Sequence, residues 1–342
     1  MSGALSAASA TPTLAGLTAA LRDGAGIGHK RDIEQVMQAL GTQPLLAGQG
    51  VVRVGDDCAA IPDGDGYLLF AIEGFVNEFV AREPWFAGYC GIMVNVSDIY
   101  AMGGRPTAVV DALWSRDGGA AQPLLDGLAT AAKVYGVPIV GGHSNRRSDR
   151  EQLSVAIIGR AKRLLTSFDA LPGQHLVAAI DLRGQFHEPY AYWNASSGAP
   201  AQRLRDDLEL LPAIAEDGLA AAGKDISMAG VVGTALMLLE CSGLGASIDL
   251  AAIPIPPGVP LQRWLNAFPS YGFLLSVDDG HLAAVLQRFA TRGLACAAIG
   301  RTDASRVVRL RLGTESDVLW DFGREPLIGC GPAAREQMSC PK

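Results

Sequence analysis

The sequence predicts an α+β protein of two domains. With 342 residues, the chain is longer than one average domain and long enough for two, each burying its own hydrophobic core. Strand-like and helix-like apolar patterns alternate along it, and the alternation restarts with a new strand after the Pro-Gly turn at residues 172–173. We therefore expect a domain boundary near residue 165.

The amino-terminal half predicts alternating helices and strands. Apolar side chains at residues 32–40 have the i, i+3, i+4, i+7 spacing of a helix on a core, and they follow the glycine-rich stretch GAGIGHK. β-branched residues bounded by Gly, Asp and Pro indicate two β segments, at 48–61 and 66–76. We then expect a helix at 83–104, a strand at 106–114, a helix at 123–136, and strands at 137–142 and 153–161.

The carboxyl-terminal half predicts a second unit of the same class. A polar, aromatic stretch at 186–202 has the character of an insertion, and we consider it a candidate contact for a substrate, or else a surface loop. Helices are expected near 203–222, 229–243 and 280–292, and strands at 246–250 and 271–278. The chain divides into a flexible glycine-rich segment at 1–30, domains at 31–165 and 166–312, and an extended arm at 313–342.

Charge and composition disfavour several classes of function. The net charge of -7 argues against a nucleic-acid partner, because surfaces that bind phosphodiester backbones carry an excess of Lys and Arg. No apolar run reaches the roughly 18 residues of a membrane-spanning helix, and no basic segment of a signal peptide is present, so we expect no membrane partner and a cytoplasmic location. The chain also lacks a Walker-type P-loop, a dinucleotide-binding glycine motif, G-x-S-x-G and H-E-x-x-H.

Acidic residues recur at the ends of apolar elements, where turns can direct them into one cleft. They are Asp56, Asp57, Glu73, Asp98 and Asp225. Each one alone also fits a solvated carboxylate or a helix cap. Two adjacent aspartates repel each other and are costly beside an apolar strand unless a cation lies between them. Because Mg²⁺ favours such hard oxygen ligands and is completed by substrate phosphates, the pattern raises the hypothesis of a metal-nucleotide site.

A glycine pair, Gly141 and Gly142, follows an apolar segment and precedes His143 and Ser144. A turn of this kind lets backbone amides approach an anion closely. Taken alone, His143 fits a hydrogen-bonded turn histidine better than a ligand. The motif is therefore a candidate anion site that needs further support.

Taken together in their order along the chain, these motifs resemble those of one ATP-dependent superfamily. Its members include aminoimidazole ribonucleotide synthetase, thiamine-monophosphate kinase, selenophosphate synthetase and a hydrogenase maturation protein that dehydrates a carboxamide. The resemblance spans roughly residues 24–303. Its most specific part is VNVSDIYAMGGRP, which is similar to an Asn-x-x-Ser-Asp-x-x-Ala-Met-Gly-Gly-x-Pro signature. Further similar stretches are VGDDCAAI, VGGHSN and DISMAGVVGTALMLLE, of which the last two are closest to selenophosphate synthetase.

The resemblance implies a two-domain PurM-like fold. Family members form homodimers through amino-terminal-domain strands that build a shared β-barrel, and their carboxyl-terminal domain is an α/β sandwich. ATP binds along the interface of the dimer. We accordingly expect an amino-terminal ATP- and metal-binding domain, a homodimer, and ATP and Mg²⁺ as cofactors.

The resemblance also implies roles for individual residues. GAGIGHK is similar to a mobile segment, here including Gly28, that folds over the ATP phosphates and delivers an essential lysine, which makes Lys30 the catalytic candidate. Metal ions would be held by Asp57, Asp98 and Asp225, with Asp56 beside them and Glu73 where relatives have aspartate. Asn95 would orient a phosphate or metal-bound water, and Gly141, Gly142, His143 and Ser144 would line the nucleotide pocket.

The leading hypothesis is a phosphoryl-transfer enzyme that phosphorylates a small acceptor or activates an amide-type oxygen. One alternative is a non-catalytic nucleotide-binding scaffold of the same fold. Another is selenophosphate synthesis, which is disfavoured because Ile27 and His29 occupy the positions of that enzyme's thiols. The thiamine kinase's Gly-Gly-Asp-Asp-Tyr-Glu-Leu motif is replaced by FPSYGFLLSV at 268–277, which disfavours thiamine phosphate.

Overall fold

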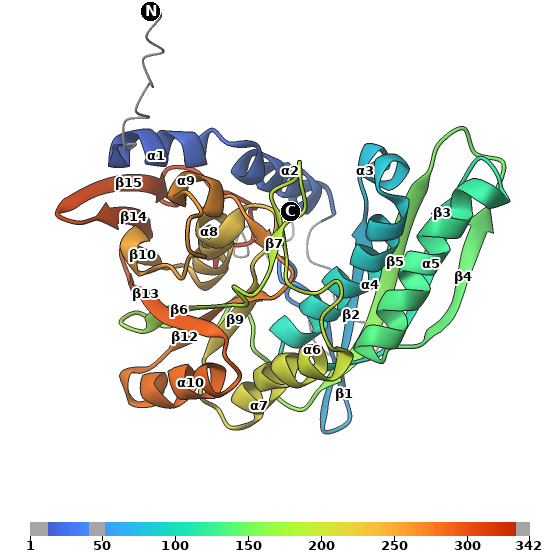
Figure 1. Cartoon of the computed structure of the whole chain (residues 1–342). Helices are drawn as coiled ribbons and strands as arrows, with labels where there is room; N and C mark the ends of the chain where they lie inside the picture. Colours follow the sequence, from blue (N-terminus) through green and yellow to red (C-terminus); the bar gives the residue numbers. More distant parts are fainter. Residues whose placement is uncertain (1–12, 41–51, 333–342) are drawn as a thin grey trace, which may run out of the picture.

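The computed structural model describes residues 13–40 and 52–332, and it has two lobes (Figure 1). The first lobe contains a five-stranded sheet in the order β1-β2-β5-β3-β4, antiparallel except for the parallel pair β3 and β4. Its elements are β1 (Ala59–Asp63), β2 (Gly66–Gly74), α3 (Asn77–Arg82), α4 (Pro84–Ala101), β3 (Arg105–Trp114), α5 (Gly118–Tyr135), β4 (Ile139–Asn145) and β5 (Gln152–Ala161). Within the described residues this sheet is open and does not close into a barrel.

The second lobe contains a seven-stranded sheet in the order β15-β14-β10-β13-β6-β12-β9, in which only β10 and β14 are parallel. The strands are β6 (His175–Ile180), β9 (Ala222–Asp225), β10 (Gly245–Asp249), β12 (Gly272–Val277), β13 (Ala295–Asp303), β14 (Val307–Leu312) and β15 (Glu315–Asp321). The helices are α6 (Ala201–Leu208), α7 (Leu210–Glu216), α8 (Gly230–Ser242), α9 (Leu261–Trp264) and α10 (Asp279–Thr291), with a 3₁₀ turn η2 (Leu250–Ala252). A small sheet of β7 (Gln185–Phe186), β8 (Tyr192–Asn194) and β11 (Phe268–Pro269) completes the lobe.

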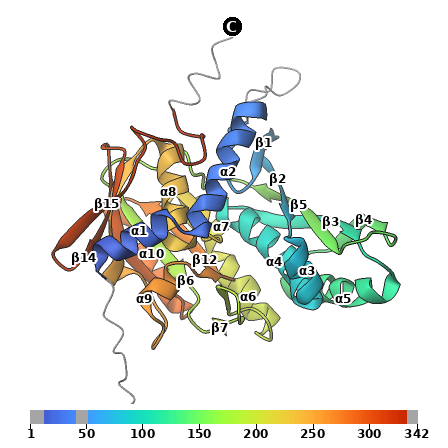
Figure 2. The ribbon, with the colours of Figure 1, turned by 90° about the horizontal axis from the view of Figure 1, so that it is seen from above.

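Two amino-terminal helices, α1 (Leu14–Arg22) and α2 (Ala25–Leu40), extend the second lobe, and α2 stands between the lobes (Figure 2). The sequence predicted a glycine-rich loop as far as residue 30 and a helix from residue 32, and this was wrong: the helix already begins at Ala25. Buried Ile27 explains the difference, because it anchors the first turn of α2 in the core of the second lobe. Lys30 therefore lies on a helix, one turn after its start.

Helix α4 is the central element of the first lobe. Residues 86–96 and 98–101 are all buried, because the sheet, α5, β9 and α7 surround the helix. A helix that is apolar on every side has to be enclosed in this way. Its two buried polar residues, Asn95 and Asp98, are the exceptions in this apolar environment. The predicted helix at 83–104 is confirmed within three residues at its carboxyl end.

The carboxyl-terminal region differs from the predicted arm. Residues 315–321 form β15, which pairs antiparallel with β14 across the two-residue turn at 313–314. The prediction missed this hairpin because the strand begins with three polar residues, ESD, and so shows no regular apolar alternation. Glu240 of α8 then fixes the chain beyond the sheet. Its buried carboxylate accepts hydrogen bonds from the backbone N–H groups of Leu327, Ile328 and Gly329 at 2.8–3.1 Å. Residues 333–342 of the predicted arm lie outside the described residues.

Among the described helices, none combines the length and apolar character required to cross a membrane.

Substitution Glu240→Gln should destabilise the protein by about 1–3 kcal/mol, because the new amide group has only one oxygen for three buried N–H donors. Urea unfolding followed by circular dichroism would measure the change. The matched control is Glu78→Gln, whose side chain is 67% exposed and which should stay within about 0.5 kcal/mol of the wild type. Equal stability of the two variants would show that Glu240 does not anchor this segment.

Candidate functional site

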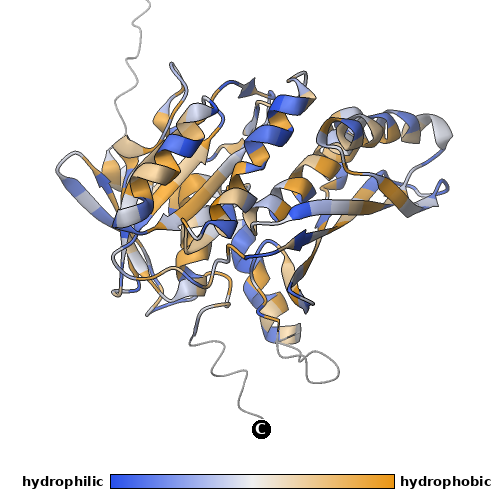
Figure 3. Ribbon diagram, turned by 90° about the horizontal axis from the view of Figure 1, so that it is seen from below, coloured by the Kyte–Doolittle hydropathy of each residue, from blue (hydrophilic) through white to orange (hydrophobic). Residues whose placement is uncertain are grey.

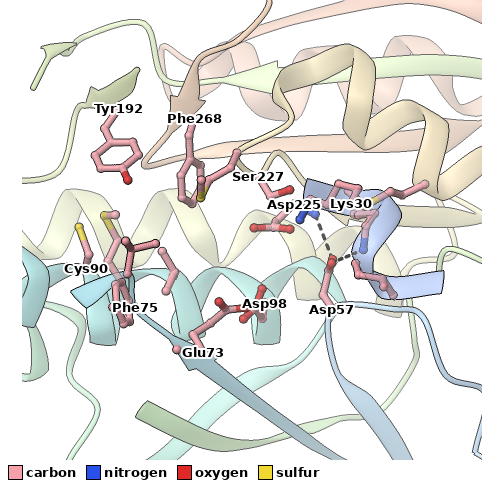
Figure 4. A pocket seen from close by; sticks show the side chains of 18 of the residues that line it. Lys30, Asp57, Glu73, Phe75, Cys90, Asp98, Tyr192, Asp225, Ser227 and Phe268 are labelled. Atoms are coloured by element: carbon pink, nitrogen blue, oxygen red, sulfur yellow. Dashed lines mark hydrogen bonds and ion pairs between the residues drawn. The ribbon is translucent and has the colours of Figure 1, made fainter. Parts of the chain in front are cut away.

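A cavity of about 470 Å³ lies where the two lobes meet, and both contribute to its lining. The first lobe supplies residues of β2, α3 and α4 and of the loop before β1, and the second supplies residues of β8, β9 and β11. One face of α2, including Lys30, Ile33 and Met37, forms a further wall. Figure 4 shows carboxylates gathered at one end of this space and aromatic rings at the other.

Three carboxylates from different elements converge at the acidic end of the cavity. Asp57 comes from the loop before β1, Asp98 from α4, and Asp225 from the end of β9. One oxygen of each lies within 4.8 Å of the others, which is close enough for one cation to contact all three. These are the three residues that the family resemblance assigned to metal binding, and the fold brings them together from positions up to 168 residues apart.

The electrostatics of this cluster favour a bound cation. Burial, and then the neighbouring carboxylates of Asp225, Glu73 and Asp57, raise the pKa of Asp98 well above its usual range. Burial and Asp57 likewise raise the pKa of Asp225, although Lys224 and Lys30 oppose this effect. Oδ2 of Asp98 is buried without a hydrogen-bond partner among the described residues. A divalent cation would both satisfy that oxygen and offset the repulsion, so the donor set fits Mg²⁺.

Asp56 and Asp57 have different roles although they are adjacent. Asp56 accepts hydrogen bonds from the backbone N–H and the hydroxyl of Ser167, both at 2.7 Å, and its role is to join the lobes. Burial raises the pKa of Asp56 to about 6, with Lys224 opposing and Asp57 adding to the shift. Asp57 accepts a hydrogen bond from the backbone N–H of Asp225 at 3.1 Å and forms an ion pair with Lys224.

Lys224 is a buried cation that the sequence analysis did not assign. It is 4% exposed, its Nζ pairs with Asp57 and lies 3.9 Å from Oδ1 of Asp56, and it lines the cavity. Burial alone lowers the pKa of Lys224, but Asp57, Asp56 and Asp225 outweigh this and hold it above its ordinary value. The sequence offered only the position of Lys224 directly before Asp225, because the strand AGKD at 222–225 and the burial of all its residues are visible only in the structure.

Lys30 and Glu73 lie at the acidic end of the cavity. Lys30 is half-buried on α2. Desolvation raises the pKa of both Glu73 and Asp225, and the charge of Lys30 opposes that rise. Glu73, near the end of β2, is exposed at the cavity wall. Gly28 precedes Lys30 on the same helix, faces solvent and does not line the cavity.

The remaining predicted nucleotide contacts lie outside the cavity. Asn95 is fully buried in α4, where its side-chain amide donates to the carbonyl of Gly91 at 2.8 Å. The turn expected at Gly141–Ser144 is instead part of β4, an exposed strand at the edge of the sheet. Gly142 has a packing reason to be glycine: a Cβ there would lie 2.7 Å from the backbone oxygen of Asp111 on β3. Within one chain, the site therefore lacks Asn95 and the β4 residues.

The sequence analysis did not identify the aromatic end of the cavity, because its residues come from four separate segments. Phe75, Phe79, Tyr192 and Phe268 are among the aromatic residues that line it. The insertion-like stretch gave a partial signal, since Tyr192, Trp193 and Asn194 within it line the cavity. The other rings come from ordinary apolar positions that sequence alone does not connect.

Comparison with known proteins assigns both lobes to one family. Residues 55–161 match the family described as AIR synthase related protein, N-terminal domain. Residues 184–313 match the family described as AIR synthase related protein, C-terminal domain. The uncharacterized protein sll0787 of Synechocystis sp. is 48% identical over 306 residues, which cover 89% of this chain and 94% of that protein.

Two solved structures are similar in fold. PurL of T. maritima, solved in complex with ATP, superposes with a TM-score of 0.69 at 20% identity, and the match covers 88% of this chain but only 49% of PurL. AaThiL, solved with AMPPCP and TMP, gives a TM-score of 0.62 at 21% identity and covers 84% of this chain and 96% of that one. At these identities the likeness shows a shared fold.

Substitution Lys224→Met should cost about 3–5 kcal/mol of stability, because it leaves the buried Asp57 carboxylate without its counter-charge. Mg²⁺ should then raise the melting temperature of Lys224→Met more than that of the wild type, since the ion replaces the missing charge. Thermal unfolding with and without Mg²⁺ measures both effects, and exposed Lys133→Met on α5 is the matched control. An equal response to Mg²⁺ in all three proteins would contradict this account of the cluster.

Proposed function

The chain belongs to the AIR synthase related family, and on that premise we propose that it is an ATP- and Mg²⁺-dependent enzyme that transfers a phosphoryl group to a small acceptor. The observation that carries the proposal is the convergence of Asp57, Asp98 and Asp225 beside Lys30 in a cavity between the lobes. The bound nucleotides of two proteins that share the fold, ATP in PurL and AMPPCP in AaThiL, support it.

The roles of the residues follow from their charge and position. Asp57, Asp98 and Asp225 would hold Mg²⁺, which neutralises phosphate charge and so favours transfer. Lys30 approaches from α2 and supplies positive charge to the transferring group, while the ion pair with Lys224 keeps Asp57 in place.

The acceptor is either a hydroxyl-type group, which would make the protein a kinase, or an amide-type oxygen that phosphorylation activates for displacement. Selenide is disfavoured, because Ile27 fills the position of the missing thiol and is buried in the core rather than directed at the cavity. Phosphorus NMR of the protein with ATP and Mg²⁺, with and without pooled metabolites, distinguishes these reactions. A new phosphate ester indicates a kinase, metabolite-dependent free phosphate indicates amide activation, and AMP indicates a selenophosphate-like route.

We further propose a homodimer, formed through the open face of the five-stranded sheet. Alternate residues of β2 point to opposite sides: Leu69 and Ala71 are buried under α4, whereas Phe70 and Ile72 are exposed. Ile72 is 66% exposed. Orange segments in Figure 3 mark hydrophobic residues along this sheet. A second copy of the chain packed on this face would remove apolar surface from water. It would also place a partner chain beside the exposed residues of β4.

Substitution Lys30→Ala should reduce the rate of ATP turnover by about 10²–10³-fold while leaving ATP affinity largely unchanged, because its charge acts on the transferring group. The matched control is Arg31→Ala, since Arg31 pairs with Glu325 at 3.0 Å and does not line the cavity. ADP release and nucleotide binding are measured separately. If the wild type binds ATP and shows no turnover with any metabolite pool, the non-catalytic scaffold replaces the enzyme hypothesis.

Substitution Phe70→Glu should convert the dimer to a monomer, because it places a charge within the apolar face. Sedimentation velocity measures the mass of each species, and Leu125→Glu, at an exposed apolar position on α5, should remain dimeric. A wild-type protein that sediments as a monomer at all concentrations would rule the dimer out.

A further inference from the structure

The cavity has a second end whose chemistry the phosphoryl-transfer proposal does not use. Phe75 follows β2, Phe79 lies on α3, Tyr192 on β8 and Phe268 on β11, so both lobes contribute. Tyr192 packs edge to face against two of the other rings: its centroid is 5.4 Å from that of Phe79 and 6.0 Å from that of Phe268. Pairing of β8 with β11 places Phe268 opposite Tyr192. Figure 4 shows Phe75, Tyr192 and Phe268 on the side of the cavity away from Asp57 and Lys30.

The aromatic end offers no positive charge. Among the described lining residues, the cations are Lys30, which Figure 4 shows beside Asp57 and Asp225, and Lys224, which forms an ion pair with Asp57. The Cys90 thiol lines the aromatic end, and burial raises its pKa, which keeps it neutral. A phosphate or carboxylate placed there would lose its hydration without gaining a counter-charge, which is costly. The site therefore selects against acceptors that are anionic at the end away from the reacting oxygen.

Two polar side chains at this end already use their oxygens within the protein. Oδ1 of Asn194 accepts the backbone N–H groups of Ser196 and Ser197 at 3.1 and 2.9 Å. Oγ of Ser270 accepts the N–H of Ala195 at 2.9 Å. A ring with several donors and acceptors on its edge, such as a purine, would leave some of them unpaired, and an apolar ring would not.

We propose that the acceptor has an uncharged aromatic or large apolar body, which binds among Phe75, Phe79, Tyr192 and Phe268 and presents its reacting oxygen to the aspartates. The orientation of the acceptor, with its reacting oxygen toward the aspartates, rests on the proposed phosphoryl transfer. The binding of an apolar ring at the aromatic end does not depend on that proposal. The cavity volume of about 470 Å³ is within the usual range for a small-molecule site.

The test uses the neutral fluorophore N-phenyl-1-naphthylamine with the full-length protein. We expect saturable fluorescence enhancement that persists when Mg²⁺ and ATP, or adenosine, are added. Phe268→Ala should weaken probe binding by about tenfold, with ATP affinity unchanged, and Leu171→Ala at an exposed position should change neither. As competitors, 1-naphthol should displace the probe and 1-naphthyl phosphate should do so at least about tenfold less well.

Three results would overturn the proposal. Displacement by adenosine would assign the aromatic end to the nucleotide base, equal competition by the naphthol and its phosphate would remove the selection against anions, and probe binding unaffected by Phe268→Ala would place the probe elsewhere. Failure of the phosphoryl-transfer proposal gives a different result: the protein would show no ATP binding or turnover but would still bind the probe at this end.

Discussion

The ion pair between Lys224 and Asp57, buried where the lobes meet, is the interaction on which the rest of the site depends. Asp57 belongs to the first lobe and Lys224 to the central sheet of the second, so the pair fixes the relative position of the lobes as well as a charge. The adjacent hydrogen bonds from Ser167 to Asp56 reinforce the same junction. Because burial makes an unpaired charge costly, the lobes are held where these groups meet.

Helix α4 adds a further carboxylate to this junction. It is enclosed by both lobes, and it places the Asp98 carboxylate beside the pair that joins them. The resulting cluster has more carboxylates than lysines, and one buried oxygen of Asp98 has no partner among the described residues. A site of this kind suits cations and the phosphates that accompany them. The aromatic end of the same cavity suits an uncharged, apolar group.

The sequence predicted the parts of the molecule that local pattern determines. The expected helices at 83–104 and 123–136 and the expected strand at 106–114 overlap α4, α5 and β3. The positions of acidic residues at the ends of apolar elements gave five metal candidates, and the family resemblance selected Asp57, Asp98 and Asp225 among them. Three-dimensional pairing determines what was missed. The course of β4 through Gly142 depends on its approach to Asp111, β15 depends on β14, and the early start of α2 depends on a core pocket for Ile27. Lys224 resembled an ordinary charged residue until the sheet enclosed it.

The most direct test of the central claim is a crystal structure of the protein with Mn²⁺ and AMPPCP, with anomalous scattering used to locate the metal. The account predicts a Mn²⁺ peak between the carboxylates of Asp57, Asp98 and Asp225, with the triphosphate of the analogue directed toward Lys30. An analogue bound elsewhere, or a bound analogue with no metal at these three residues, would contradict it.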